Sequence, residues 1–587
     1  MGFFRRRRGR SARCYVIAEA SEAGAVRKAG QPAESRRARA AKRSRNRIAM
    51  VALVFGLAYA GLAARLAFIS IGGSNAYDRE VAAAPRDDRP RPDILDRNGV
   101  ILATNLPMTA LEIAGGDVWD AHETATKLAE AFPEINAAAL ETKLKDGRYV
   151  EVLGDLTPEQ KERAFRLGLP GVRFAARARR FYPQEALAAH VIGLTEPGKG
   201  GVMGLERALD ERREDGPLVS SLDIRVQQAL EAEIRSIAEK YRAKAGWGIV
   251  MNAATGEVIA LASYPDFDPN DPAAAPADWR RNRATYDDYE LGSAFKTITA
   301  AAALETGAAS EASVYDARGV YRIAGRTIHD YHPQNRMLSL SEVIQYSSNI
   351  GAARIAADLG TDEQRAFIRA LGLADALPIE LPENRAPQLP DRWGPVETAT
   401  IAFGHGIAVT PLHLLAAFTA IVNGGEYRTP TFLKATGARP GKRVFSEKTS
   451  AIMRRILRRV VTDGTAEYAK APGYFPIGKT STADKVENGG YDVSARIASF
   501  VGAFPGYAPR FTVMISLDDP QGVKDTYGYA TAGWNVAPAF GRLVQRIAPT
   551  LGVMPVNEAT ALAGFYEGYQ SADARVRARA GAVGGGE

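Results

Sequence analysis

The segment Leu291-Gly292-Ser293-Ala294-Phe295-Lys296-Thr297-Ile298 leads into an alanine-rich apolar run, a pattern that predicts a helix starting near its serine. Ser293 and Lys296 are three positions apart, so a helix places both side chains on one face. A serine hydroxyl becomes an effective nucleophile when a base takes its proton. A lysine shielded from water can be that base, because its charged form is disfavoured. The alternative is an exposed serine and lysine on an ordinary helix, since this spacing alone is a weak motif.

A second polar group, Ser347-Ser348-Asn349, begins 54 positions after Ser293. Ser339 and Glu342 form a capping box that predicts a short helix just before this group, and a second helix follows it. A break between two helices presents hydroxyl and amide groups to a cleft. We therefore expect Ser347 to relay a proton and Asn349 to hold an amide.

A third element, Ile477-Gly478-Lys479-Thr480-Ser481-Thr482-Ala483, has the composition of a β-strand. Alternation along a strand predicts that Lys479 and Ser481 point to one face and that Thr480 and Thr482 point to the other. A strand with this pattern can line a cleft.

Two competing patterns overlap or imitate this element. Residues 473–480 (GYFPIGKT) match a phosphate-binding loop letter for letter, but their interior is bulky and contains proline. Residues 484–490 are also expected to form a turn rather than the helix that such a loop requires. Lys448-Thr449-Ser450 repeats the K-T-S letters at the start of an amphipathic helix, where its side chains are expected to cap that helix. Neither pattern is favoured as a site.

Around these elements, residues 217–555 mix helical and strand-like patterns. The predicted elements are a helix beginning by Asp223, strands Trp247–Met251 and Glu257–Leu261, strands Ile497–Phe504 and Phe511–Leu517, and a helix around Pro538–Ile547. Strands at both ends of the region with helices between them predict one antiparallel sheet flanked by helices, plus a helical subdomain. The Ala-, Arg- and Gly-rich residues 556–587 are expected to form a flexible tail.

The region 72–216 is expected to be a stalk followed by a non-catalytic domain. Its residues Asp93–Leu102 predict two strands joined at an Asn-Gly turn, and Thr157–Gln160 is a capping box that starts a helix. The other signals in this region are weak and mixed. We interpret it as elongated and mostly β, which makes the chain as a whole α+β.

The N-terminal residues are strongly basic and then abruptly apolar. Residues 1–47 hold 15 Lys and Arg against three acids, and residues 48–71 are uncharged except for Arg65. The first segment predicts a disordered basic arm, and the second predicts a single transmembrane anchor of about 36 Å. By the positive-inside rule the arm is cytoplasmic. A buried core helix and a signal peptide cleaved near Ala58-Tyr59-Ala60 are the less favoured alternatives.

The charge balance and the cysteine content exclude several classes of protein. The chain of 587 residues carries a net charge of +8, but its first 47 residues account for +12 and the remaining 540 for −4. A nucleic-acid-binding fold spreads basic surface over its folded part, so that class is excluded. The one cysteine, Cys14, lies in the arm, which excludes a disulfide framework and a cysteine metal site. His329 and His332 lack a clear third ligand, so no metal site is predicted there.

The motifs at Ser293 and Lys296, at Ser347 and Asn349, and at residues 479–481 resemble, in this order, those of the penicillin-recognising serine transpeptidases. Flanking segments look like class B penicillin-binding proteins, in both the non-catalytic and the catalytic domain. These segments are Asp93–Gly99, Arg180–Pro183, His190–Gly193, Gly204–Glu206, Leu222–Asp223, Trp247–Val250, Pro265–Asn270, Gly404–Gly406 and Asp518–Gly522. The resemblance covers roughly residues 48–550, and the last segments look most like the division (septal) type.

This resemblance implies a serine D,D-transpeptidase that cross-links peptidoglycan stem peptides and that β-lactams inhibit. It implies that Ser293 attacks the D-alanyl-D-alanine carbonyl, that Lys296 takes its proton, and that Ser347 passes a proton to the leaving D-alanine. It also implies an inner-membrane protein with a periplasmic catalytic domain and no cofactor. The implied partners, besides the membrane, are a membrane-embedded glycosyltransferase and other division proteins.

The family also assigns binding roles to the remaining motif residues. Asn349 would hydrogen-bond the donor peptide, and Lys479 and Thr480 would recognise its terminal carboxylate. The backbone N–H groups of Ser293 and Thr482 would form the oxyanion hole.

One residue departs from the family pattern, because Ser481 stands where the family usually has glycine. A side chain at this position is expected either to crowd the acyl group or to offer it a hydrogen bond, so Ser481 is counted among the substrate-binding residues. Three alternatives remain open. They are an elongation-type transpeptidase, a D,D-carboxypeptidase or β-lactamase-like hydrolase, and a division scaffold with a vestigial active site.

Overall fold

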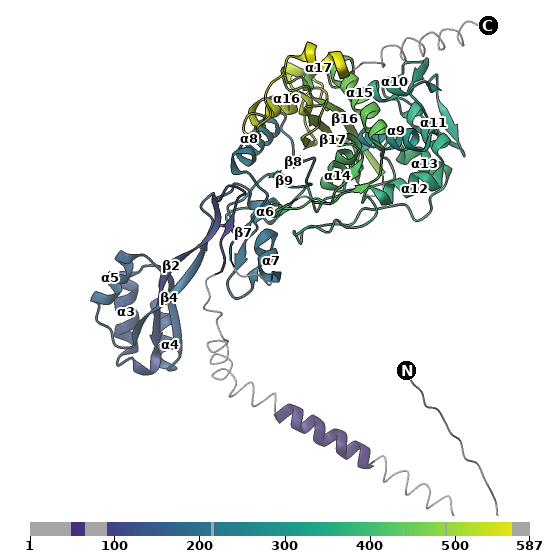
Figure 1. Cartoon of the computed structure of the whole chain (residues 1–587). Helices are drawn as coiled ribbons and strands as arrows, with labels where there is room; N and C mark the ends of the chain where they lie inside the picture. The colour runs from purple at the N-terminus through teal and green to yellow at the C-terminus, as the bar shows by residue number, and fades with distance from the viewer. Residues whose placement is uncertain (1–48, 65–90, 213–215, 438, 488–489, 566–587) are drawn as a thin grey trace, which may run out of the picture. The chain divides into compact units, whose positions relative to one another are not determined.

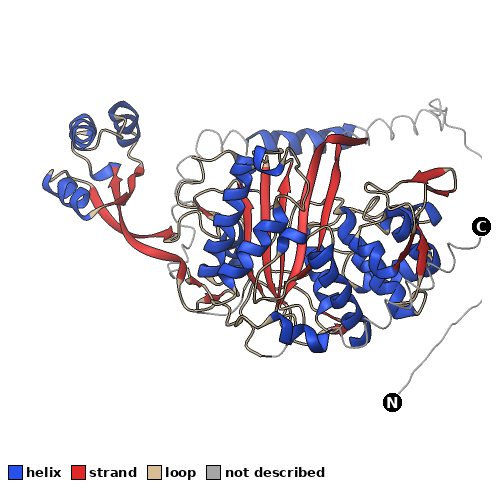
Figure 2. Cartoon of the chain, turned by 90° about the horizontal axis from the view of Figure 1, so that it is seen from above, coloured by secondary structure: helices blue, strands red, loops and turns tan. Residues whose placement is uncertain are grey.

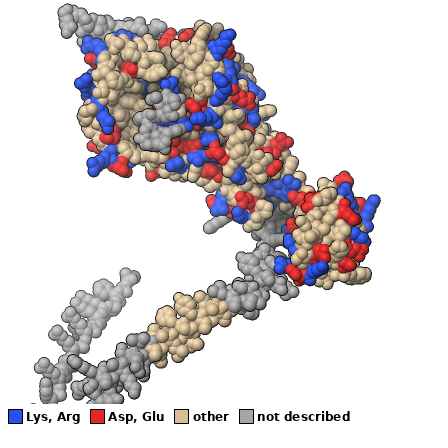
Figure 3. All heavy atoms as spheres, turned by 180° about the vertical axis from the view of Figure 1, so that it is seen from behind, with Lys and Arg blue, Asp and Glu red and all other residues tan. Residues whose placement is uncertain are grey.

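The computed structural model describes residues 49–64, 91–212, 216–437, 439–487 and 490–565 (Figure 1). The chain divides into two compact units, residues 1–88 and residues 89–587. In the first unit, residues 49–64 form one uncharged helix, drawn entirely in tan in Figure 3. No helix in the described part of the chain is both long and apolar enough to cross a membrane. The predicted arm, 1–47, and residues 48 and 65–71 of the predicted anchor lie outside the described residues.

The second unit is centred on a five-stranded antiparallel sheet, which runs between the helices in Figure 2. Its strands are β8 (Ala245–Asn252), β9 (Val258–Tyr264), β16 (Ile477–Glu487), β17 (Gly490–Phe504) and β18 (Phe511–Asp518). Their order is β16-β17-β18-β8-β9, so strands from the two ends of the region pair in the middle, as the sequence predicts. β16 forms one edge of the sheet, with Lys479 opposite Val501 of β17.

Three helices cover the two faces of this sheet. They are α8 (Ile224–Lys240), α14 (Pro411–Val422) and α16 (Val536–Ile547). A Cβ added at Gly248 would collide with α8 and one at Gly502 would approach α16, so glycine lets these helices pack closely on one face. On the other face, Thr512 bonds Thr419 of α14 at 2.7 Å.

A helical subdomain packs against β16 and carries most of the predicted motifs (Figure 1). Its helices are α9 (Phe295–Thr306), α10 (Leu340–Gln345), α11 (Asn349–Leu359), α12 (Thr361–Ala370) and α13 (Pro395–Ile401), and α15 (Glu447–Asp463) leads back into β16. Short strands complete it: β10 (Val314–Asp316), β11 (Tyr321–Ile323), β12 (Arg326–Ile328) and β13 (Met337–Ser339). A further pair of short strands, β14 (Glu426–Tyr427) and β15 (Lys442–Arg443), follows α14, and β14 contacts that helix. The alanines of α9 are buried, and their small side chains let neighbouring helices approach.

The region before residue 217 is built on a second sheet. Its strands are β1 (Ile94–Leu95), β2 (Ile101–Ala114), β3 (Tyr149–Leu156), β4 (Val172–Phe181) and β7 (Leu218–Val219). β2 pairs antiparallel with β1, β3 and β4, and β1 pairs in parallel with β7. β1 and β2 flank the turn at Asn98-Gly99, as predicted.

The prediction that this region is mostly β is wrong, because helices account for at least as much of it as strands. The helices are α3 (Ala121–Ala131), α4 (Ala137–Lys145), α5 (Pro158–Arg166), α6 (Ala189–Ile192) and α7 (Gly204–Glu211). They are short, and the buried face of α3 consists of Thr124, Ala125 and Leu128, so its apolar periodicity is faint in the sequence. Only α5 carries the predicted start signal, a capping box at Thr157.

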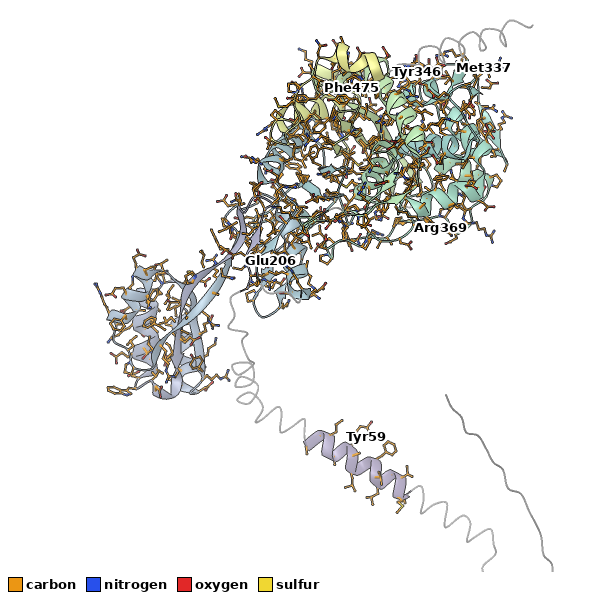
Figure 4. All side chains as sticks on the ribbon, in the orientation of Figure 1. Tyr59, Glu206, Met337, Tyr346, Arg369 and Phe475 are labelled. Carbon is orange, nitrogen blue, oxygen red and sulfur yellow. The ribbon has the colours of Figure 1, made fainter. Side chains whose placement is uncertain are left out.

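Glu206 of α7 is fully buried among arginines and is labelled in Figure 4. Its carboxylate accepts hydrogen bonds from Arg91 and from Arg180 at 2.6 Å each, and Arg91 also pairs with Asp210. Arg180 belongs to β4, so this acid–base cluster ties the end of β4 to α7.

Two predictions about the ends of elements are also wrong. Residues 484–487 continue β16 instead of forming a turn, because they pair with residues of β17. Helix α17 (Glu558–Phe565) lies inside the stretch expected to be a flexible tail. It packs on α15 and on the residues before β16, since Glu558 pairs with the buried Arg458 at 3.4 Å and Phe565 contacts the ring of Phe475 edge-on at 5.1 Å.

Candidate active site

Ser293 lies in a 3-10 turn, η3 (Gly292–Ala294), that runs directly into α9. Gly292 has a φ of +50°, a left-handed conformation that favours glycine. Gly404 faces this turn so closely that a Cβ on it would lie 2.3 Å from the Gly292 carbonyl oxygen. The two glycines therefore hold Ser293 at a sharp entry into the predicted helix.

Lys296 lies one helical turn after Ser293 and is only 1% exposed. Its Nζ lies 3.0 Å from Ser293 Oγ and donates to the carbonyl oxygen of Ser347 at 2.5 Å. Burial holds the pKa of Lys296 well below its usual value, and the charge of Lys479 lowers it further, while Asp330 opposes both effects. A lysine with such a pKa is readily neutral, and it can take the proton of the Ser293 hydroxyl.

Ser347 occupies the break between α10 and α11, after the helix that the Ser339 capping box begins. Its φ of +62° is unusual for a residue with a Cβ. Ser347 Oγ lies 2.9 Å from Ser293 Oγ and 3.1 Å from Lys296 Nζ. Backbone conformations of this kind concentrate at functional sites, where they aim a side chain.

Lys479 reaches the same place from β16. It is fully buried, and its Nζ donates to Ser347 Oγ at 3.1 Å and to the carbonyl oxygen of Thr480 at 2.9 Å. Burial lowers the pKa of Lys479 to about 7. Two lysine amines thus flank one serine hydroxyl, an arrangement that disfavours two ammonium groups at neutral pH.

The two serines of this network open onto a cavity of about 360 Å³. Ser293, Ser347 and Asn349 line it from the helical subdomain, and Thr480 and Thr482 line it from β16. The three predicted motifs, which are up to 186 positions apart between Ser293 and Lys479, therefore meet around one space.

The predicted alternation along β16 is present. Thr480 and Thr482 face the cavity, where Thr480 Oγ1 lies 2.6 Å from Thr465 Oγ1 and Thr482 Oγ1 accepts a hydrogen bond from the N–H of Ala532 at 3.1 Å. These contacts fix both threonine side chains at the rim of the sheet.

Ser481 points elsewhere and does not line the cavity. It is buried, and its Oγ donates to the carbonyl oxygen of Leu291 at 2.5 Å, two residues before Ser293. A Cβ added at Gly292 would lie 2.9 Å from Ser481 Oγ, so the serine side chain lies directly against this turn. The hydroxyl therefore braces the turn that carries Ser293, and this geometry gives no support to the expected contact with the acyl group.

Asp330 is a site residue that the sequence patterns do not indicate. Its carboxylate accepts hydrogen bonds from Ser348 Oγ at 2.7 Å and from the N–H of Ile350 at 2.9 Å, so it holds the start of α11. Next to it, the carbonyl oxygen of His329 accepts a hydrogen bond from Asn349 Nδ2 at 3.0 Å. A lone aspartate in a segment without clear periodicity gives no signal that would find it.

Aromatic and charged residues outside the three motifs also line the cavity. They are Tyr331, His332, Tyr346, Phe403, His405, Asp484, Arg496 and Trp534, of which Tyr346 is labelled in Figure 4. Burial lowers the pKa of His405, while Glu290 and Asp484 act in the opposite direction. The glycines on both sides of His405 are the one sequence signal that marks this position.

Two family models match this chain. The model described as penicillin binding protein transpeptidase domain matches residues 246–541, and the model described as penicillin-binding protein dimerisation domain matches residues 87–216. The first matched range contains every residue of the cavity described above.

Curated relatives match most of the chain. A probable peptidoglycan D,D-transpeptidase FtsI of Caulobacter vibrioides is 41% identical over 90% of this chain and 93% of its own length. The peptidoglycan D,D-transpeptidase FtsI of Escherichia coli is 29% identical over 79% of this chain and 84% of its own length.

Solved structures show the same fold. Penicillin binding protein 3 of Mycobacterium tuberculosis, solved with aztreonam, superimposes with a TM-score of 0.64 over 80% of this chain and 97% of its own, at 23% identity. The transpeptidase domain of penicillin-binding protein 3 of Burkholderia pseudomallei superimposes with a TM-score of 0.52 over 58% of this chain and 98% of its own, at 33% identity.

Proposed function

The chain belongs to the class B penicillin-binding proteins of the division type, and we therefore propose that it cross-links peptidoglycan stem peptides through an acyl-enzyme on Ser293. The observation that carries this proposal is the hydrogen-bond network in which Ser293 Oγ lies 3.0 Å from the buried Lys296 Nζ and 2.9 Å from Ser347 Oγ. A nucleophile, a base of lowered pKa and a second hydroxyl at these distances suit acyl transfer.

In the acylation step, Lys296 takes the proton of Ser293 Oγ as this oxygen attacks the carbonyl carbon of the penultimate D-alanine. Negative charge then develops on the carbonyl oxygen. The backbone N–H groups of Ser293 and Thr482 are proposed to donate hydrogen bonds to it, and the N-terminus of α9 contributes a favourable dipole.

The leaving D-alanine needs a proton on its nitrogen when the peptide bond breaks. Ser347 Oγ lies 3.1 Å from both Lys296 Nζ and Lys479 Nζ, so it is proposed to pass this proton from Lys296. Lys479 and Thr480 hold the terminal carboxylate, and Asn349 holds the donor amide. The amine of a neighbouring stem then attacks the ester, which forms the cross-link and releases Ser293.

We place the chain in the inner membrane by a single anchor at residues 48–71, with the arm 1–47 in the cytoplasm and the catalytic domain in the periplasm. The charge of +12 on residues 1–47 against −4 on the remainder supports this orientation. The anchor and the region 72–216 are the proposed contacts of a membrane-embedded glycosyltransferase and of other division proteins.

The test is covalent labelling of a soluble form that starts at Gly73 with a fluorescent penicillin. We expect one stable adduct per chain and none on Ser293→Ala; a label that persists on Ser293→Ala would overturn the assignment of the nucleophile. Fast hydrolysis of the adduct would favour a β-lactamase-like enzyme, and an unlabelled parent would favour a scaffold. Localisation of the tagged protein to the lateral wall instead of the septum would favour the elongation type.

A further inference from the structure

Beyond the catalytic network, the cavity contains one pair of opposite charges. Asp484 of β16 and Arg496 of β17 are cross-strand partners, and Arg496 Nε lies 3.2 Å from Asp484 Oδ1. Both residues line the same cavity as Ser293. Their side chains are 39% and 36% exposed, respectively, so a ligand in the cavity can reach both.

The position of Asp484 along β16 relates it to the reaction. Thr480, Thr482 and Asp484 occupy alternate positions on the cavity side of this edge strand, about 6.6 Å apart in succession. In the proposed reaction, Thr480 binds the terminal carboxylate of the donor, and the N–H of Thr482 binds the oxygen of its scissile carbonyl. Asp484 therefore lies beside the part of the donor that precedes the scissile residue, toward the start of the stem.

The end of the cavity that holds Asp484 and Arg496 faces the part of the donor that stays bound to the enzyme as the acyl group. The attacking amine must enter where the leaving D-alanine departs, because the two steps are the forward and reverse forms of one acyl transfer. Lys479 and Thr480 lie at the end where D-alanine leaves and the amine enters, opposite Asp484. An extended peptide advances about 3.3 Å per residue, so the residue before the scissile one brings its side chain within reach of Asp484 and Arg496.

The pair presents a negative and a positive group side by side. A carboxylate pairs with an ammonium group, and a guanidinium pairs with a carboxylate, most strongly when both are charged. We propose that Asp484 and Arg496 bind the third residue of the donor stem and select a diamino diacid, whose side chain ends in an ammonium and a carboxylate group. This inference rests on the proposed function, because it uses the direction of the donor along β16.

The competing explanation is an ion pair that only supports the β16–β17 ladder. Ion pairs with this much exposure contribute little to stability, so support of the strands alone does not explain why the pair faces the cavity. The two explanations differ in whether a change at the pair depends on the third residue of the donor.

The test uses the full-length chain in detergent and three D-alanyl-D-alanine stem peptides. Their third residue is a diamino diacid, lysine, which lacks the terminal carboxylate, or norleucine, which lacks both groups. The measurement is the ratio of kcat/KM values between donors within each variant, so a general loss of activity cancels. We expect the parent to prefer the diacid over lysine, and lysine over norleucine, by about tenfold each.

In the variants, Arg496→Gln should reduce the first preference to about twofold or less, and Asp484→Asn should do the same to the second. Exchange of the two charges, Asp484→Arg with Arg496→Asp, keeps an ion pair but reverses its order, so it should abolish the preference for the diacid. Arg542→Gln, which breaks an Arg–Glu pair at 2.6 Å between α16 and α8, is the matched control and should leave both ratios unchanged.

Equal kcat/KM values for the three donors in the parent would overturn the inference while leaving the acyl-enzyme intact. So would ratios that survive in Arg496→Gln and in the exchanged pair. A parent that is not acylated by penicillin or by any donor would overturn the proposed function, and this inference with it.

Discussion

Two clusters of buried charge in the second unit are opposite in design. Around Glu206, one carboxylate lies between Arg91 and Arg180, so each charge has a partner of the opposite sign. Around Ser347, the buried amines of Lys296 and Lys479 converge on a hydroxyl, and burial outweighs the opposing charge of Asp330. A compensated cluster keeps its charges and joins elements, whereas an uncompensated one gives up a proton and becomes a base.

The largest effect should come from removing the proposed base, Lys296. Lys296→Gln leaves Ser293 without a proton acceptor, so we expect acylation by penicillin to slow by about 10³-fold. Stopped-flow fluorescence measures this rate. The control is Lys448→Gln in the second K-T-S segment, which should acylate like the parent; if both variants acylate normally, the amine of Lys296 is not the base.

Breaking the compensated cluster should affect folding instead of chemistry. Glu206→Gln takes the counter-charge from Arg180 and leaves Arg91 with Asp210 alone, so the free energy of unfolding should fall by about 3 kcal/mol. Urea unfolding of the soluble form measures this difference. The same change at the exposed Glu162, which pairs with Arg166 within α5, should alter it by less than about 0.5 kcal/mol. Equal effects at the two positions would contradict the comparison.

The pH dependence of acylation tests how neighbouring charges shift the pKa of Lys296 in the second cluster. In the proposed mechanism acylation needs neutral Lys296, so its rate should fall as pH drops through the pKa of this lysine, which burial and Lys479 hold below the usual value. Lys479→Gln removes a charge that lowers this pKa, so the acidic limb should move to higher pH. Asp330→Asn removes a charge that raises it, so the limb should move to lower pH. Shifts in the same direction would contradict this electrostatic account.

The smallest effect should come from Ser481, next to the uncompensated cluster. Ser481→Ala removes the hydrogen bond to Leu291 but leaves the cavity lining intact, so acylation should slow by about fivefold, equivalent to about 1 kcal/mol. The dissociation constant of the initial penicillin complex should stay the same. A large change in that constant would mean that the hydroxyl contacts the ligand after all.

Local patterns predict those parts of the site that local geometry determines. The spacing of Ser293 and Lys296, the helix break at Ser347 and the alternation along residues 479–482 are all present in the structure. The contact of Lys479 with Ser347, 132 positions away, depends on how the helical subdomain packs against β16. No local pattern contains that packing.

The same distinction explains the predictions that are wrong. α3 and α4 bury alanine, threonine and leucine instead of a broad apolar face, so a search for periodicity misses them. Whether Ser481 points to the acyl group or to Leu291 depends on a neighbouring turn that contacts it from 190 positions away. Asp330 binds the start of α11 but lies 18 positions before Ser348 in the sequence. The capping pattern around Ser347 therefore gives no indication of Asp330.

The docking of α17 has a practical consequence for protein engineering. Glu558 and Phe565 contact Arg458 and Phe475, and Arg458 donates to Pro476, the residue before β16. A chain cut after residue 555 would lose these contacts, and Phe475 and Pro476, which lead into the strand that carries Lys479, would be less firmly held. Affinity tags and fluorescent reporters therefore belong after residue 565, and shortened versions for drug screening should keep this helix.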